Sequence, residues 1–237
     1  MSWLRRTIRR DPDPAALAEQ VPPGPLRTYL RTPPPPADTP ADSLPMLTLD
    51  LETTGLDPGS DAILSYGWVP VDAGSITLAG ARHILVRADR DVGASATIHG
   101  ITDDELATGI SPASALDDLF TALTGRVLLA HHARLEVGFV AVATERAYGI
   151  RPPFVVVDTM ETERRIQTTP WVPEPRPGSL RLWAARERYR LPVYRAHNAL
   201  ADAQSCAELH LAQVAELAAC SDRPPTLGSL RTPISSS

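Results

Sequence analysis

The amino-acid sequence predicts an α/β fold in which helices cover a mixed β-sheet. Short apolar runs with strand character recur through the middle of the chain, at residues 46–52, 126–130 and 154–158. Helical segments lie between and after these runs, and strands mixed with helices favour a layered α/β architecture. Residues 62–86 indicate two further strands around a turn at 71–75, and such a hairpin makes the sheet mixed rather than purely parallel.

The helices are predicted from their caps and their periodicity. Residues 101–107 carry Thr102 near their start and Glu105 three positions on, which is the capping-box pattern. The next helix ends in a glycine, a common stop signal. Further helices are expected over residues 114–125, 134–149, 178–189 and 198–220.

Three parts are expected along the chain. Residues 1–44 are punctuated by prolines, which predicts an extended arm or linker with a short helix near residues 15–20. Residues 45–222 hold the predicted strands and helices and form the expected globular domain. Residues 223–237 lack periodicity, which predicts a flexible tail.

Composition and charge exclude some classes of function. Of the 237 residues, 43% are hydrophobic and 22% are charged, so a packed core is expected. The net charge of −5 argues against a protein that coats nucleic acid, but not against an enzyme that holds one strand end in a small cleft. All 23 basic residues are arginine, which suits bidentate phosphate recognition. A GC-rich coding bias gives the same composition, and we favour it.

The sequence also indicates where the protein works. No stretch approaches the roughly 20 apolar residues of a membrane span, and the Arg-rich start lacks the apolar part of a secretory signal. The two cysteines, Cys206 and Cys220, lie 14 positions apart in one predicted helix, so they cannot bridge each other. A reduced protein in the cytoplasm, without membrane contact, is therefore expected.

Two carboxylates stand out in the first strand. Asp50 and Glu52 are two positions apart, so both side chains point to the same face of the sheet. Like charges that are desolvated together repel each other, and a bound divalent cation would remove that cost. An exposed strand face is the other interpretation of this pattern.

Glu136 lies in the first turn of its predicted helix. It shares a helical stripe with Val140 and Ala143, which is otherwise apolar, so its side chain is expected to face the interior. A carboxylate is also favoured at this position by the helix dipole, by typically 0.3–1 kcal/mol. Glu136 is therefore either part of a site or a charge that stabilises the helix start.

A histidine and an acid mark the start of the last long helix. Asp202 shares a helical stripe with the apolar Cys206 and Leu209, and His197 precedes it by five residues. The two side chains could form a capping pair, or they could be a general base beside a metal ligand.

These five residues together are typical of phosphodiester chemistry. Sites with several carboxylates suit Mg²⁺ or Mn²⁺. Two such ions about 3.5–4 Å apart can clamp the attacking and the leaving oxygen, while His197 could take a proton from water. Spacing alone does not show that the groups meet.

Five landmarks over residues 45–217 give the chain a specific resemblance. They are Asp50–Leu56 (DLETTGL), Ile98–Thr102 (IHGIT), Ala130–Val140 (AHHARLEVGFV), Val155–Thr159 (VVVDT) and His197 with Asp202. In this order they resemble the motifs of the DnaQ-like (DEDDh) 3′–5′ exonucleases, the superfamily of the proofreading epsilon subunit of bacterial DNA polymerase III.

The resemblance implies a ribonuclease-H-like three-layer fold with a mixed five-stranded sheet. It implies that Asp50, Glu52 and Asp202 hold two divalent cations, Mg²⁺ or Mn²⁺, and that His197 is the general base. Nucleoside monophosphates would then leave from single-stranded or frayed 3′ ends of DNA or RNA. The residues implied to line the end nucleotide are Thr53, Thr54, Gly55 and Leu56, with His99 and His132.

The second catalytic motif departs from the family. Glu136 stands where the family usually has Asp, His132 where it has Asn, and Leu135 where it has an aromatic residue. We expect Glu136 to be a metal ligand with a longer reach. Two alternatives stay open: a catalytically weak or inactive module that binds nucleotide or acts as a scaffold, and an exoribonuclease on short RNA. A polymerase or another nucleic-acid enzyme is the expected protein partner.

Overall fold

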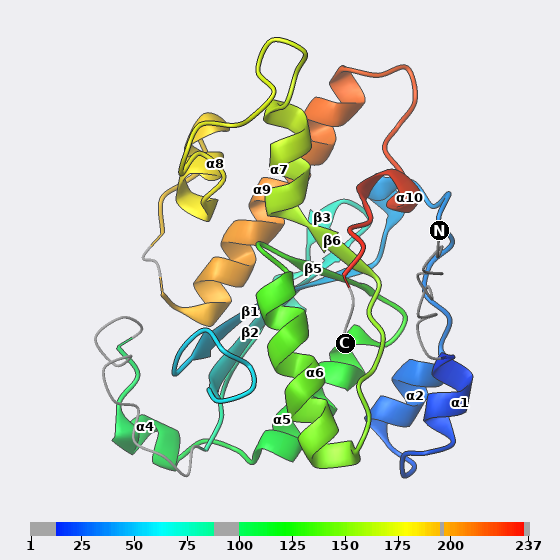
Figure 1. Cartoon of the computed structure of the whole chain (residues 1–237), viewed down its shortest axis with the longest axis vertical. Coiled ribbons are helices and arrows are strands. Elements are labelled where there is room, and N and C mark those ends of the chain that lie inside the picture. The colour runs from blue at the N-terminus through cyan, green and yellow to red at the C-terminus, as the bar shows by residue number, and fades with distance from the viewer. Residues whose placement is uncertain (1–12, 88–99, 195–196, 235–237) are drawn as a thin grey trace, which may run out of the picture.

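A mixed sheet forms the centre of the computed structural model, which describes residues 13–87, 100–194 and 197–234. The strand order is β3-β2-β1-β5-β6, and β4 also pairs with β2 (Figure 1). β1 is antiparallel to β2 and parallel to β5, and β5 is parallel to β6. The strands are β1 (Met46–Thr53), β2 (Ile63–Asp72), β3 (Ser75–Ile76), β4 (Arg82–Leu85), β5 (Val127–Ala130) and β6 (Val156–Asp158).

The sheet contains six strands rather than the five expected, because the second arm of the hairpin is divided. β3 pairs with the end of β2, and β4 pairs with its middle. The short 3₁₀ turn η2 (Leu78–Gly80) separates the two pieces. Since β1 occupies the other edge of β2, β3 and β4 share one edge, and the sheet is five positions wide.

Helices cover both faces of the sheet, which gives the predicted three layers (Figure 1). On one face α5 and α6 pack against Leu47, Leu49 and Leu51 of β1. On the other face α9 and α10 pack against Met46 and its neighbours. The helices are α1 (Pro14–Ala18), α2 (Pro25–Arg31), α4 (Asp103–Ala107), α5 (Pro112–Leu123), α6 (Arg134–Tyr148), α7 (Thr159–Gln167), α8 (Leu182–Arg188), α9 (Ala199–Ala219) and α10 (Leu227–Leu230); a 3₁₀ turn, η1, spans Ala41–Ser43.

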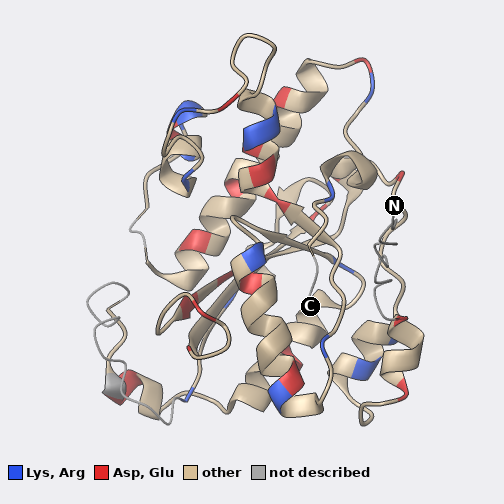
Figure 2. Cartoon of the chain, viewed as in Figure 1, with Lys and Arg blue, Asp and Glu red and all other residues tan. Residues whose placement is uncertain are grey.

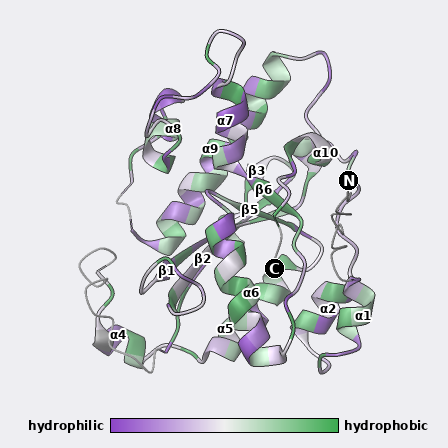
Figure 3. Cartoon of the chain, in the orientation of Figure 1, coloured by the Kyte–Doolittle hydropathy of each residue, from purple (hydrophilic) through white to green (hydrophobic). Residues whose placement is uncertain are grey.

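Strand alternation explains the two cores. The odd-numbered leucines of β1 enter the core with α5 and α6, whereas Met46 enters the core with α9. Figure 3 shows the central strands as mostly hydrophobic. Asp50 and Glu52 continue the Met46 face, so the alternation carries both carboxylates toward α9.

The helix ends follow the sequence signals. Thr102 and Glu105 form the capping box at α4, and Gly125 has a positive φ of 74° just past α5. Within the described ranges, every helix is too short or too polar to cross a membrane.

The segments that flank the predicted domain pack onto it. Leu17, Val21, Leu26 and Leu30 are buried in the core with α5, and α10 buries Leu227 and Leu230 in the other core. The two segments also pair with each other, since Ala41 N–H donates to Pro225 O at 2.8 Å and Leu227 N–H donates to Thr39 O at 3.0 Å. The boundaries after residues 44 and 222 stay a prediction.

Candidate active site

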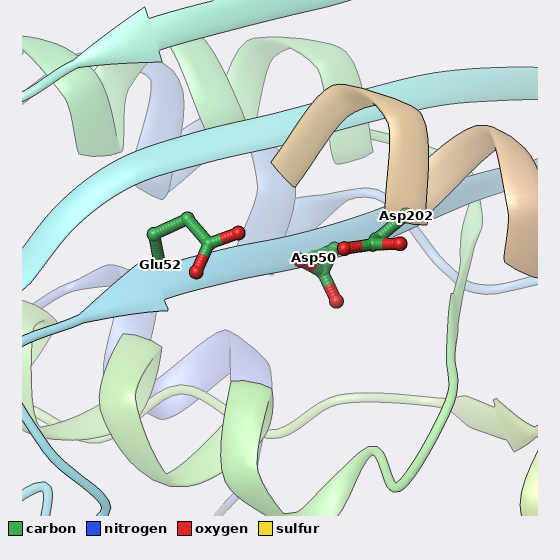
Figure 4. Close-up of side chains that lie close together, drawn as sticks. All are labelled: Asp50, Glu52 and Asp202. Atoms are coloured by element: carbon green, nitrogen blue, oxygen red, sulfur yellow. The ribbon is translucent and has the colours of Figure 1, made fainter. Parts of the chain in front are cut away.

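Three carboxylates meet where β1 passes the start of α9. Asp50 and Glu52 come from β1 and Asp202 from the first turn of α9, and one oxygen of each lies within 4.8 Å of the others (Figure 4). Asp50 and Glu52 thus share one face of the strand, and Asp202 lies on the inward-facing stripe of its helix, as the sequence periodicity predicts. These three residues could hold a divalent metal ion.

A glycine lets the two elements come this close. Gly67 of β2 lies directly opposite Asp50 in the sheet. A Cβ at Gly67 would lie 2.0 Å from the backbone carbon of Ala199, in the first turn of α9. No side chain fits there, so Gly67 allows the helix start to rest on the sheet. A glycine inside an apolar strand is a sequence signal for such a close approach, but Gly67 is not among the predicted site residues.

The carboxylates of the site are not neutralised by direct ion pairs. None of the ion pairs formed by the described residues involves Asp50, Glu52, Asp202 or Glu136. Burial, followed by the charges of the neighbouring acids, raises the pKa of Asp50 well above its ordinary value. Burial and the charge of Asp202 raise the pKa of Glu52 to about 7. Burial also raises the pKa of Asp202, although the His197 N–H partly offsets it. Such a cluster is relieved by a cation.

Glu136 lies inside the protein, as its stripe predicts, but outside this group of three. Its side chain is 4% exposed, and Oε2 has no hydrogen-bond partner. Burial raises its pKa to about 8. Its charge also raises the pKa of Asp50, so the two carboxylates influence each other. The interpretation as a solvated charge at a helix start does not fit this burial.

Asp158 fixes the loop that leads to Glu136. Its two carboxylate oxygens accept the N–H groups of His132 at 3.0 Å and Ala133 at 2.9 Å. Asp158 also caps α7 by accepting from Met160 N–H. His132 has a left-handed φ of 67°, and these bonds hold it there. Asp158 lies in the motif Val155–Thr159, but no role was predicted for it from the sequence.

His197 lies next to Asp202, at the edge of the pocket beside the acidic cluster. Its backbone N–H donates to Asp202 Oδ2 at 2.8 Å, and its φ of 66° is left-handed. The ring is exposed, and His197 lines a pocket of about 860 Å³ together with Asp50 and Asp202. The predicted base and two of the predicted metal ligands therefore share one pocket.

His131, by contrast, is a structural histidine. Its Nε2–H donates to Leu180 O at 2.9 Å, which leaves Nδ1 to accept from Thr159 Oγ1 at 2.8 Å. Burial lowers its pKa to about 4, so the ring is neutral. It joins the end of β5 to the segment before α8.

The loop after β1 is held by its own side chains. Thr53 Oγ1 donates to Gly55 O at 2.6 Å, and Thr54 Oγ1 donates to Asp61 Oδ1 at 3.0 Å. A Cβ at Gly55 would lie 2.4 Å from Asp61 Oδ2, so a side chain there would displace the carboxylate that accepts from Thr54 Oγ1 and Asp57 N–H. Leu56 is 78% exposed. The remaining residue expected at the end nucleotide, His99, lies outside the described residues.

A buried arginine joins α8 to α9, which the sequence did not predict. Arg186 donates from Nη2 to Pro192 O at 2.7 Å and to Glu208 Oε2 at 2.8 Å. Its Nη1 donates to Ser205 O. Arg186 therefore sets the position of α8 beside the pocket.

A mixed sheet with helices on both faces, and an acidic cluster where its first strand meets α9, is the arrangement of a nuclease-like hydrolase of the ribonuclease-H-like fold. The pattern of the exonuclease family RNase_T matches residues 47–210. The chain belongs to this exonuclease family, and the DEDDh resemblance of its motifs is confirmed.

Known proteins support the assignment. A DNA polymerase III PolC-type from Thermotoga petrophila is 27% identical over 175 residues, which are 73% of this chain and 12% of that protein. The chain thus spans a small part of this relative. Exonuclease X in complex with 5′ overhanging duplex DNA has a TM-score of 0.55 and 22% identity, over 72% of this chain and 92% of that one. The nuclease domain of 3′hExo, a DEDDh family member bound to rAMP, has a TM-score of 0.62 and 14% identity, over 75% and 95%. At these identities the two structures show the shared fold.

Proposed function

We propose that the protein is a metal-dependent 3′–5′ exonuclease. It releases nucleoside monophosphates from single-stranded or frayed 3′ ends of DNA or RNA by two-metal-ion hydrolysis. The observation that carries this proposal is the cluster of Asp50, Glu52 and Asp202, of which Asp50 and Asp202 share a pocket with His197. Membership of the exonuclease family supports it.

The donor set fits divalent cations. Asp50, Glu52 and Asp202 offer carboxylate oxygens within 4.8 Å of one another, and Oε2 of Glu136 is buried without a partner. Oxygen-only donors suit Mg²⁺ or Mn²⁺. We assign the first three residues as ligands and Glu136 as the supporting ligand of a second ion. Bound ions would supply the positive charge that favours water ionisation and offsets charge on the leaving oxygen.

The chain's own residues supply proton transfer and orientation. His197 accepts a proton from the attacking water, which its exposed position at the pocket mouth allows. The hydroxyls of Thr53 and Thr54 are engaged within their own loop. The exposed Leu56 and the backbone around Gly55 are therefore left to contact the end nucleotide, and the proposed contacts of His132 and of His99, which lies outside the described residues, follow from the resemblance.

A direct test uses oligonucleotides labelled at one end. Wild-type protein with Mg²⁺ or Mn²⁺ should shorten a 5′-labelled strand one nucleotide at a time, while a 3′-labelled strand should lose its label at once. Asp50→Asn should remove the activity and leave the fold intact. Activity that persists in Asp50→Asn, or label release from the 5′ end first, would refute the proposal. Matched DNA and RNA strands identify the substrate, including the short-RNA alternative.

The position and protonation of Glu136 support a second candidate function, in which the protein binds nucleotide but cleaves it slowly. Its carboxylate lies outside the group of three, and burial raises its pKa to about 8, so in the metal-free protein it is mostly protonated at neutral pH and a first ion must displace that proton. Glu136→Asp restores the acid that the family usually has and should raise the rate if the longer side chain limits it. Mn²⁺ calorimetry with a mononucleotide separates the candidates, since binding without turnover identifies the module.

The likeness to a segment of a DNA polymerase III makes a polymerase the partner to test by copurification. We place the protein in the cytoplasm, because both cysteines are free thiols.

A further inference from the structure

The pocket at the acidic cluster extends away from it along α8. On that side its wall carries Arg181, Trp183 and Arg190. A second pocket, of about 840 Å³, is also lined by Arg181, Trp183 and Glu187. Because the two pockets share these residues, Trp183 stands between two adjoining hollows, one of which reaches the acids.

The charge of this wall differs from that of the chain as a whole. Among the described residues, Arg176, Arg181 and Arg190 form no ion pair, whereas Arg186 and Arg188 are paired with glutamates. Apart from the two acids of the site, Glu187 is the acid that lines these pockets. Figure 2 shows basic residues gathered around α8. Although the chain has a net charge of −5, guanidinium groups without ion pairs line the two adjoining pockets.

Trp183 is not needed for the packing of its helix. α8 buries Ala185 and Arg186, yet the Trp183 side chain is 64% exposed, whereas Trp68 is 3% exposed in the core. An exposed indole flanked by unpaired arginines is the arrangement on which bases of single strands stack while their phosphates are neutralised.

We propose that α8 and the residues that flank it form a binding track for the unpaired strand that leads to the end nucleotide. The track consists of Trp183 as the stacking platform and Arg176, Arg181 and Arg190 as phosphate partners. The occupant is single-stranded nucleic acid, because positive charge, an aromatic face and continuity with the acidic pocket coincide. This inference rests on the proposed function, and it adds where the strand lies beyond the reacting phosphodiester.

Binding of strands of different length tests the track. The full chain is titrated in Ca²⁺ with a fluorescent oligothymidylate of about 12 nucleotides, a length within the range that one domain covers, and with thymidine 5′-monophosphate. Trp183→Ala should weaken oligonucleotide binding by at least about fivefold, as expected for the loss of one stacked base. The ratio of oligonucleotide to mononucleotide affinity should fall accordingly. Trp183 is exposed, so the variant should keep its circular dichroism spectrum and melting temperature.

Charge variants give effects of opposite sign. Arg181→Gln combined with Arg190→Gln should weaken binding and reduce the slope of log affinity against log salt by roughly 1.4, since each lost phosphate contact accounts for about 0.7 on single strands. Glu187→Gln should strengthen binding, because it removes the acid beside the path. A purely structural role of α8 would not produce this increase.

Two control variants match the chemistry. Trp171→Ala removes an indole that is 91% exposed and lines neither pocket. Arg223→Gln removes one exposed charge elsewhere. Both should bind as the wild type does.

Wild-type affinity in Trp183→Ala, or equal losses in the two controls, would overturn the proposal; the first result would leave a protein partner as the occupant of this face. If the wild type binds the strand with these mutational effects but cleaves no 3′ end, the proposed activity fails and the track stands. If it cleaves 3′ ends and Trp183→Ala binds normally, the track alone fails.

Discussion

Replacement of Gly67 by alanine should separate the acidic cluster without touching any of its members. The added Cβ would lie 2.0 Å from Ala199 C, 2.2 Å from Leu200 N and 2.3 Å from Ala199 O. In proteins, a Cβ atom essentially never lies closer than 3.0 Å to a heavy atom to which it is not covalently linked through its own or a neighbouring residue. All three neighbours are backbone atoms of α9, so no side chain can rotate to relieve the clash. The start of α9 must therefore withdraw from β2 by at least about 1 Å.

This withdrawal carries Asp202 and His197 away from Asp50. A displacement of about 1 Å in a catalytic group can cost about 100-fold in rate, and we expect a loss of at least that size in kcat/KM for Gly67→Ala. Overpacking of this kind also destabilises by typically 1–3 kcal/mol, so the melting temperature should fall while the protein still folds. Mn²⁺ affinity should fall together with the rate.

The assay is steady-state degradation of an end-labelled oligonucleotide, with a thermal melt of the same sample. Gly24→Ala is the matched control, because a Cβ at Gly24 meets no atom within 4 Å. That variant should keep its rate, although the loss of the glycine N-cap of α2 should lower its stability somewhat, so it separates destabilisation from loss of site geometry. Wild-type kcat/KM in a folded Gly67→Ala would refute the claim that contact between α9 and β2 sets the geometry of the site.

Other outcomes follow from the same site. Asp158→Asn should lower activity, because the amide keeps only one oxygen and leaves one of the N–H groups of His132 and Ala133 without an acceptor. An unsatisfied buried donor costs about 1–3 kcal/mol of stability, which urea unfolding measures. Metal-free protein should lose stability as pH rises from about 6.5 to about 8, because folded Glu136, with a pKa raised to about 8, keeps a proton that the unfolded chain has released; below about pH 6.5 the lowered pKa of buried His131 has the opposite effect. The loss is about 1.4 kcal/mol per pH unit for each retained proton, and it shows in thermal melts with a chelator. Glu136→Gln should flatten that dependence, and a melting temperature that rises with pH over this range in the chelated wild type would contradict the reasoning. Added Mn²⁺ should stabilise the wild type more at about pH 8 than at about pH 5, and Asp50→Asn should weaken this effect.

The positions of the acids could be predicted because each depends on local periodicity. Strand alternation places Asp50 and Glu52 on one face, and the helical stripe turns Glu136 inward. The meeting of Asp202 with the strand acids depends instead on a contact between distant segments, and Gly67 carries that contact by the absence of a side chain. The one sequence signal is the glycine itself in an apolar strand, and it does not say which segment approaches.

The flanking segments show the opposite limit of sequence patterns. Their prolines suggested an extended chain, yet Leu26 and Leu30 are buried on the helix α2, which begins at Pro25. Proline at the first position of a helix is favourable, so the same residue type that suggested an arm starts a packed helix. The hydroxyls of Thr53 and Thr54 likewise looked free for substrate, but the loop itself uses them.

The pairing of the two flanking segments has a practical consequence for anyone who shortens the chain. The family pattern covers residues 47–210, and a fragment cut to that range would lose α2, α10 and the last turns of α9. It would uncover apolar side chains in both cores, among them Val157 of β6 beneath α10 and Phe120 of α5 against Tyr29. Such a fragment should aggregate even though every acid of the site is present. The N-terminal and C-terminal segments each cover one core and are hydrogen-bonded to each other. The solubility of a shortened protein therefore depends on keeping both segments.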